Sequence, residues 1–144
     1  PLPSIISALQ VQHGRGIDEF LIPPPIFEAM RGKFIEYDAP AGVLTTRFPV
    51  LPEHLNPYRT LQGGILAAAV DNTLGPLSML VAPPNVTRRL ELTYNRPVPA
   101  DLPYIVVRAQ FLGREGQQLT FKATVRDPAG VLLARARALH WITG

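Results

Sequence analysis

The sequence predicts an α+β fold in which an antiparallel sheet is wrapped around one long central helix. Residues 60–79 are rich in Leu and Ala and lack the strict alternation of a strand, so they predict the helix. The last third of the chain alternates apolar and polar residues with a period of two. That period is typical of antiparallel strands that are covered on one face.

The central helix is expected to begin after Thr60 as its N-cap, with Gly63 and Gly64 in the first turn. It is apolar nearly all round, which is typical of a buried helix. Gly75 and Pro76 are expected to bend it or break it locally. The helix should end before Pro83, and a row of alanines in the last strand would let its backbone approach the sheet.

The remaining elements follow in order along one expected domain, residues 1–144. Residues 1–32 are predicted to be an N-terminal helical extension, with short helices at 4–12 and 25–30. A hairpin is expected across Pro40-Ala41-Gly42. The predicted strands and turns are these: strands near 34–37, 43–48, 89–94, 105–111, 119–126 and 134–138, and turns at 114–116 and 127–130.

Composition excludes several classes of function. The 144 residues include no cysteine, which removes disulfides, thiol nucleophiles and cysteine zinc sites and fits a cytoplasmic protein. We expect neither a signal peptide nor a membrane span, because no basic leader and no uninterrupted apolar run of ~18 residues is seen. The net charge of +3 comes with dispersed arginines, which argues against nucleic acid. Two interpretations of the basic charge stay open: a solvated surface, or a local patch that binds a phosphorylated small molecule.

The central helix carries the candidate chemistry. Asp71 is an ionisable side chain within the apolar run, and a buried carboxylate without partners costs several kcal/mol. It is therefore a candidate base or nucleophile, or else a structural carboxylate. The backbone N–H groups of Gly63 and Gly64 have no intrahelical partner and no shielding side chain. They could face the oxygen of a ligand carbonyl, or the glycines could serve close packing against the sheet.

Two motifs connect these residues to a known family. The first runs from Asn56 through Gln62-Gly63-Gly64 to Asp71-Asn72, and the second from Thr87 to Thr93-Tyr94-Asn95-Arg96-Pro97. Over about residues 34–141 the chain resembles the hotdog-fold acyl-CoA thioesterases. It is most similar to the branch that includes the phenylacetyl-CoA and the medium- and long-chain acyl-CoA thioesterases. The resemblance implies a hotdog fold and hydrolysis of a thioester.

The resemblance also implies roles for single residues. Asp71 matches the catalytic carboxylate, and Gly63 matches the glycine whose N–H polarises the thioester carbonyl. Asn56 matches the asparagine that helps to hold the carbonyl or the attacking water, and Thr87 matches a Ser or Thr that positions this water. Gln62 stands where the family usually has His. Glutamine still donates and accepts hydrogen bonds, but it cannot titrate.

Other residues are weaker candidates for binding substrate. His54 lies close to Asn56 in the chain and could line the site together with Gly64. Arg88 and Arg89 could meet the phosphates of coenzyme A, although a solvated strand face explains them almost as well. The three histidines lack the spacing of metal ligands, so we expect no metal and no cofactor.

We therefore predict an acyl-CoA thioesterase. The alternative is a non-catalytic acyl-CoA-binding hotdog protein, because Gln62 replaces a histidine; a hotdog dehydratase is disfavoured because its His/Asp pair is absent. Gly63 and Asp71 are eight residues apart, about 12 Å along one helix. One helix cannot easily bring both residues to one thioester, so we expect a homodimer in which each site is shared between two chains. The resemblance implies that such dimers often pair again into a homotetramer. The acyl chain and its carrier, coenzyme A or an acyl-carrier protein, stay open.

Overall fold

The computed structural model describes residues 2–14 and 20–144. Its helices are α1 (Leu2–His13), α2 (Pro25–Ala29) and α3 (Gly63–Val81), with a short 3₁₀ helix η2 (Pro52–His54). The strands are β1 (Lys33–Asp38), β2 (Val43–Pro49), β3 (Asn85–Tyr94), β4 (Tyr104–Glu115), β5 (Gln118–Arg126) and β6 (Leu132–Ile142). The helices and strands expected from the sequence are all present, with ends that differ by a few residues.

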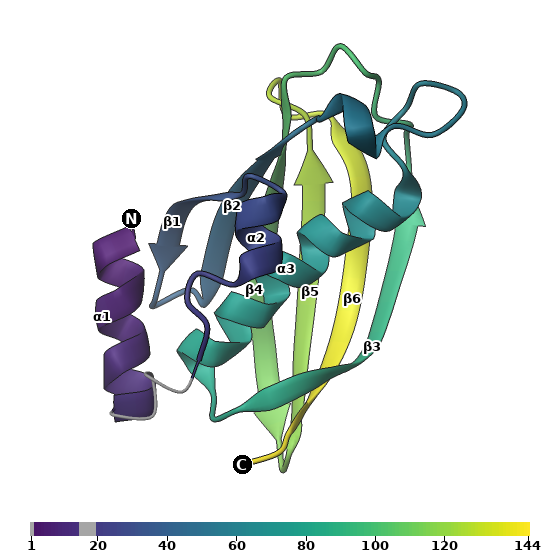
Figure 1. Ribbon diagram of the computed structural model, residues 1–144. Coiled ribbons are helices and arrows are strands. Elements are labelled where there is room, and N and C mark those ends of the chain that lie inside the picture. Colours follow the sequence, from purple (N-terminus) through teal and green to yellow (C-terminus); the bar gives the residue numbers. More distant parts are fainter. Residues whose placement is uncertain (1, 15–19) are drawn as a thin grey trace.

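Within the described residues the six strands form one antiparallel sheet in the order β1-β2-β4-β5-β6-β3. Helix α3 lies across this sheet, and β3 runs along the edge opposite to β1 (Figure 1). Three pairs of consecutive strands form hairpins, β1–β2, β4–β5 and β5–β6, while β2 pairs with β4 and β3 crosses over to pair with β6. The predicted arrangement, a sheet wrapped around one long helix, is confirmed.

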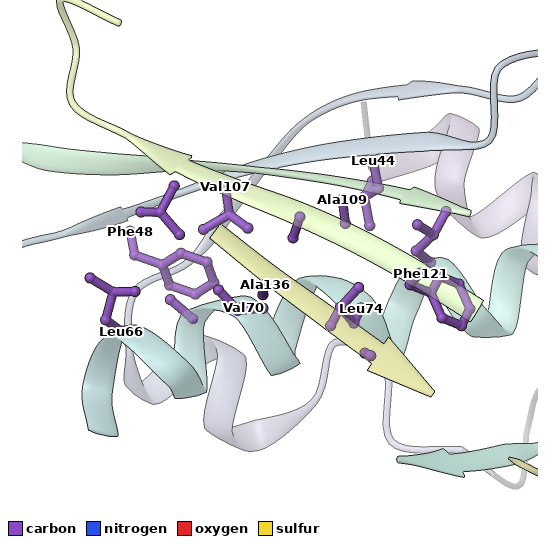
Figure 2. Packing of buried hydrophobic residues seen from close by; sticks show 14 of the residues in the cluster. Leu44, Phe48, Leu66, Val70, Leu74, Val107, Ala109, Phe121 and Ala136 are labelled. Carbon is purple, nitrogen blue, oxygen red and sulfur yellow. The ribbon is translucent and has the colours of Figure 1, made fainter. Parts of the chain in front are cut away.

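The core lies between α3 and the covered face of the sheet. Leu66, Val70 and Leu74 of α3 point toward Val107 and its neighbours in the strands (Figure 2). Every second residue of β5 and β6, and of β4 from Ile105 to Ala109, is buried, as the period of two predicts. The buried row of β6 includes three alanines: Ala134, Ala136 and Ala138. Their small side chains allow the close approach of helix and sheet that the sequence indicated.

The start of α3 differs from the expectation. Gln62, not Thr60, is the N-cap, and its Oε1 accepts a hydrogen bond from the N–H of Ile65 at 3.1 Å. Thr60 is held elsewhere, because it forms an isolated β-bridge with Pro99 and its hydroxyl accepts from the side chain of Asn56. A tertiary contact has thus replaced the cap that local sequence preference predicts.

Of the bend or local break expected at Gly75 and Pro76, the break does not occur, because α3 runs through both residues. Proline removes one backbone hydrogen bond from the helix, a loss that surrounding packing can outweigh. Here Leu74 and Leu77 are fully buried on either side of Pro76. Burial on both sides of the proline holds the two halves of the helix against the same sheet.

Helix α3 is also not buried all round, contrary to expectation. The sheet covers one side of it, and Gly64 and Asp71 on another side are exposed. By length and composition α3 could cross a membrane. Its packing against β2, β3, β4 and β5 accounts for the apolar composition as that of the core helix of the sheet.

Candidate functional site

The loop before α3 is fixed by backbone hydrogen bonds to two other segments. The N–H of Gln62 donates to the carbonyl of His54 at 2.9 Å, and the N–H of Leu61 donates to the carbonyl of Val98 at 2.8 Å. These bonds tie the first turn of α3 to η2 and to the connection between β3 and β4. The predicted residues His54 and Gln62 are therefore brought together with Gly63, and the helix start is held rigidly.

Gly63 lies directly against Tyr94 at the end of β3. The Tyr94 hydroxyl donates to the carbonyl oxygen of Gly63 at 2.7 Å. A Cβ atom at Gly63 would lie 3.3 Å from Cζ of the tyrosine ring, a tight contact that a small shift of either residue would have to relieve. In residues 2–14 and 20–144 no acceptor is found for the N–H of Gly63 or Gly64. The first turn therefore presents backbone donors, as the sequence predicted.

A pocket of about 270 Å³ opens beside this helix start. Its walls combine residues of α3 and of the chain after β3: Leu61, Gly63, Leu66, Tyr94, Asn95, Arg96, Pro97 and Val98. Two leucines, a valine and a proline supply apolar lining, while the tyrosine, asparagine and arginine supply polar groups. Such a mixture suits a ligand with an apolar part and a polar group that binds at the helix start.

Asn56 organises its own turn. Its Oδ1 accepts from the N–H groups of Tyr58 and Thr60 at 2.9 and 3.1 Å, and its Nδ2 donates to the Thr60 hydroxyl at 2.9 Å. These bonds fix the orientation of the amide, because exchanging its oxygen and nitrogen would place donors against donors. In the described part of the chain Nδ2 has this one acceptor, which leaves its second hydrogen for a ligand.

Asp71 is exposed rather than buried, which corrects the expectation of a buried carboxylate. Its side chain points toward the edge strand β3 rather than into the core. The hydroxyl of Thr87, on β3, donates to Oδ1 of Asp71 at 3.0 Å. This bond brings together two residues that are 16 positions apart in the chain. Both were predicted to act on the attacking water.

Behind Thr87 lies a buried histidine that the sequence interpretation left out of the site. Nε2 of His140 is 3.4 Å from the Thr87 hydroxyl, and its Nδ1 is 2.8 Å from Oδ1 of Asn85. His140 is 1% exposed, and this burial lowers its pKa, against a smaller raising effect of the Asp71 charge. The sequence pattern could have predicted this burial, because His140 continues the alternation of the buried alanines in β6.

The two predicted arginines make other contacts. The guanidinium of Arg88 lies over the ring of Trp141, 4.7 Å from its centroid, and Arg89 forms an ion pair with Glu91. Both arginines are exposed. The strand register shifts between Thr87 and Arg89, so Arg88 occupies a β-bulge. These contacts match the solvated-strand alternative, and they join neither arginine to Gly63 or Asp71.

One chain therefore holds two separate groups of candidate residues on α3. The first surrounds the helix start, with Gly63, Gln62 and Asn56. The second is centred on Asp71 and Thr87, two turns further along the same helix. Because α3 runs continuously through both, the rise of about 12 Å between Gly63 and Asp71 that the sequence predicts applies.

Comparison with known proteins finds relatives by sequence, the acyl-coenzyme A thioesterase 13 proteins of Pongo abelii and Homo sapiens. Acyl-coenzyme A thioesterase 13 of Homo sapiens is 31% identical over 115 residues, which cover 77% of this chain and 81% of that protein. No model of a protein family matches the sequence.

Solved structures share the fold over most of the chain. The E. coli PaaI protein from the phenylacetic acid degradation operon has a TM-score of 0.80 at 17% identity, covering 96% of each chain. A protein from Streptococcus mutans UA159, solved bound to acetyl CoA, has a TM-score of 0.76 at 18% identity, covering 86% of this chain and 96% of that one. At these identities the similarity establishes the fold, in agreement with the sheet order and the central helix described above.

Proposed function

The chain belongs to the hotdog-fold family of acyl-coenzyme A thioesterases, and we propose that it hydrolyses an acyl-CoA thioester to a free acid and coenzyme A. The observation that carries this proposal is the hydrogen bond between Thr87 and Asp71. It holds an exposed carboxylate beside a hydroxyl, and together they can orient one water molecule for attack. The relatives named for thioesterase activity and the structure bound to acetyl CoA support the substrate class.

In the proposed reaction Asp71 acts as general base or nucleophile toward the thioester carbon. The N–H of Gly63 donates to the carbonyl oxygen as negative charge develops on it. The remaining hydrogen of Asn56 Nδ2 can donate to the same oxygen or to the attacking water. Gln62 caps the helix and holds its first turn, a role that needs no titratable side chain, so glutamine can replace the family's histidine.

We further propose that each site forms between two chains. An oxyanion donor must lie about 3 Å from the carbonyl oxygen, and the base must act on the same reacting carbon. Gly63 and Asp71 of one helix are too far apart for this. Strand β3 is an edge strand of the sheet and carries Thr87, so a second copy pairing along this edge would bring its own helix start toward Asp71.

The first test is the release of free thiol from a panel of acyl-CoAs, comparing the wild type with Asp71→Asn. We expect the substitution to lower kcat by about 10²- to 10⁴-fold, because the amide keeps the shape of the side chain but cannot accept a proton. Asp101→Asn, in an exposed loop, is the matched control and should retain wild-type activity. A folded Asp71→Asn protein with wild-type kcat would contradict the catalytic assignment.

The same assay separates the alternative function. A non-catalytic acyl-CoA-binding protein would bind the substrate panel, as measured by calorimetry, and release no thiol from any member. Binding without release would overturn the proposed hydrolysis while leaving the hotdog fold and the ligand class in place.

A further inference from the structure

The face of the sheet that points away from α3 is basic along β5 and β6. These two strands together contain four Lys and Arg residues and no Asp or Glu. In β5 Lys122 follows the buried Phe121, and in β6 the buried Ala136 separates Arg135 from Arg137. Successive side chains of a strand point to opposite faces, so these three basic side chains point away from the core and from α3.

The strand register places like charges beside one another. Lys122 of β5 is the direct partner of Arg137 of β6, and Arg135 lies two residues before Arg137, about 7 Å along the strand. Like charges directly opposite one another destabilise an antiparallel pair. Glu91 of β3 is the partner of Arg137 on its other side, but its carboxylate pairs with Arg89. Within the described part of the chain this is the one ion pair, so the three basic residues have no carboxylate partner.

A hollow of about 390 Å³ lies over this cluster, and we call it the basic hollow. Arg135 is flanked by two threonines, because its direct partners are Thr124 on β5 and Thr93 on β3. Threonine hydroxyls donate hydrogen bonds, so the hollow offers neutral donors beside the cationic ones. The polar side chains that line it come from three neighbouring strands: Glu91, Thr93, Lys122, Thr124, Arg135 and Arg137.

We propose that the basic hollow is a second binding site, which takes the diphosphate group of a small molecule between Lys122, Arg135 and Arg137. Guanidinium groups bind phosphate oxygens through paired hydrogen bonds, and an ammonium group binds them as a point charge. Two linked phosphates suit arginines that start about 7 Å apart along one strand. A multiply charged anion also relieves the repulsion between Lys122 and Arg137, which a solvated surface leaves in place.

The site is separate from the candidate thioester site. Gly63 and Asp71 belong to α3, and α3 packs on the opposite face of the sheet. The sheet therefore lies between the basic hollow and these residues. The inference goes beyond the proposed hydrolysis and does not depend on it.

Calorimetric titration with inorganic diphosphate at fixed ionic strength tests the site directly. We expect Arg135→Gln and Arg137→Gln each to raise Kd at least about tenfold, which corresponds to the loss of one charge-assisted hydrogen bond. Arg114→Gln is the matched control. It removes the same charge at the hairpin between β4 and β5, where Arg114 donates to the carbonyl of Gly116, and it should leave Kd unchanged.

Two results of this titration would overturn the inference. One is a wild-type protein that does not bind diphosphate. The other is an Arg114→Gln protein that loses as much affinity as Arg137→Gln, because the binding would then follow net charge and not the basic hollow.

The carboxylate in the hollow provides a test of opposite sign. Glu91→Gln removes the negative charge that faces the bound anion, so we expect diphosphate to bind more tightly, by about two- to fivefold, the effect of one exposed charge pair. Weaker binding by this variant would contradict the proposed position of the ligand.

Thermal unfolding checks the repulsion. Diphosphate should raise the Tm of the wild type, because a ligand that binds only the folded state stabilises it. Without diphosphate, Lys122→Gln should have a Tm no lower than that of the wild type, because it removes the like charge opposite Arg137. A lower Tm would contradict the repulsion from which the site is inferred.

Steady-state kinetics separate this site from the one for acyl-CoA, whose coenzyme also carries a diphosphate. We expect Arg137→Gln to leave KM for acyl-CoA unchanged. If KM rises by the same factor as Kd for diphosphate, the basic hollow belongs to the substrate site and the inference is overturned, while the proposed hydrolysis stands. A protein that binds diphosphate in the hollow and hydrolyses no thioester supports this inference and overturns the proposed function.

Discussion

At the scale of single residues, the candidate site contains two adjacent glycines, Gly63 and Gly64, with different neighbours. A Cβ at Gly63 would press on the ring of Tyr94, whereas a Cβ at Gly64 would meet Oε1 of Gln62 at 2.8 Å. The first neighbour is a ring with its own hydrogen bond to Gly63, and the second is the end of a flexible side chain that caps the helix through Ile65. The two adjacent glycines should therefore respond differently to the same substitution.

We expect Gly63→Ala to lower kcat for acyl-CoA hydrolysis by about 10- to 100-fold, less than the loss of a complete oxyanion donor, because the helix start must shift away from Tyr94. Gly64→Ala should mainly displace the Gln62 cap and cost about 1 kcal/mol of stability. Steady-state kinetics and thermal unfolding of both variants check this. Equal kinetic losses in the two would argue against a special position for Gly63.

At the scale of secondary-structure elements, α3 is joined to β2 by a buried pair of threonines. The hydroxyls of Thr46 and Thr73 are 2.7 Å apart, and both residues are fully buried. Thr73 donates to the carbonyl of Ala69 within its own helix, at 2.8 Å. Its single proton is thereby used, so Thr46 must be the donor of the bond between the two elements.

This direction predicts unequal effects on stability. Thr73→Val leaves the Thr46 hydroxyl buried without an acceptor and should cost about 1–3 kcal/mol. Thr46→Val leaves Thr73 bonded to Ala69 and should cost less, about 0.5–1.5 kcal/mol. The double variant should be more stable than the sum of the two losses implies. Urea unfolding of the three proteins measures this, and strict additivity would contradict the coupling.

At the scale of the whole molecule, the candidate residues divide into two half-sites on one helix. The half around Gly63 offers donors, and the half around Asp71 offers acceptors. In the proposed reaction neither half is sufficient alone, because charge stabilisation and water activation must act on the same carbonyl. The exposed side of α3, with Gly64 and Asp71, and the edge strand β3 are the surfaces from which the proposed dimer would join them.

Mixing inactive variants tests the shared site. Asp71→Ala and Asn56→Ala impair different halves, so a mixed dimer holds one site with both lesions and one intact site, and activity should return. Asp71→Ala mixed with Thr87→Ala is the control, because both lesions affect the same half and every mixed site stays impaired. Subunit exchange is verified by native mass spectrometry. Exchange without recovery in the first mixture would refute sharing between chains.

The sequence by itself determined the architecture and named most of the candidate site residues. The period of two in β4, β5 and β6 predicted the covered sheet, and the Leu- and Ala-rich run predicted α3. The motif from Asn56 to Asp71 supplied candidate residues for both of the proposed half-sites. These patterns are local, so spacing along the chain reports them directly.

Only the tertiary structure decided how these residues are used. In the structure Gln62 is the N-cap of α3, and the helix continues through Pro76. Asp71 is exposed, because the core covers only one side of the helix. The tertiary structure also brought His140 behind Thr87 across the β3–β6 pairing, 53 residues away along the chain. Strand pairing and burial are set by contacts between distant segments, and no periodicity within one segment encodes its partner.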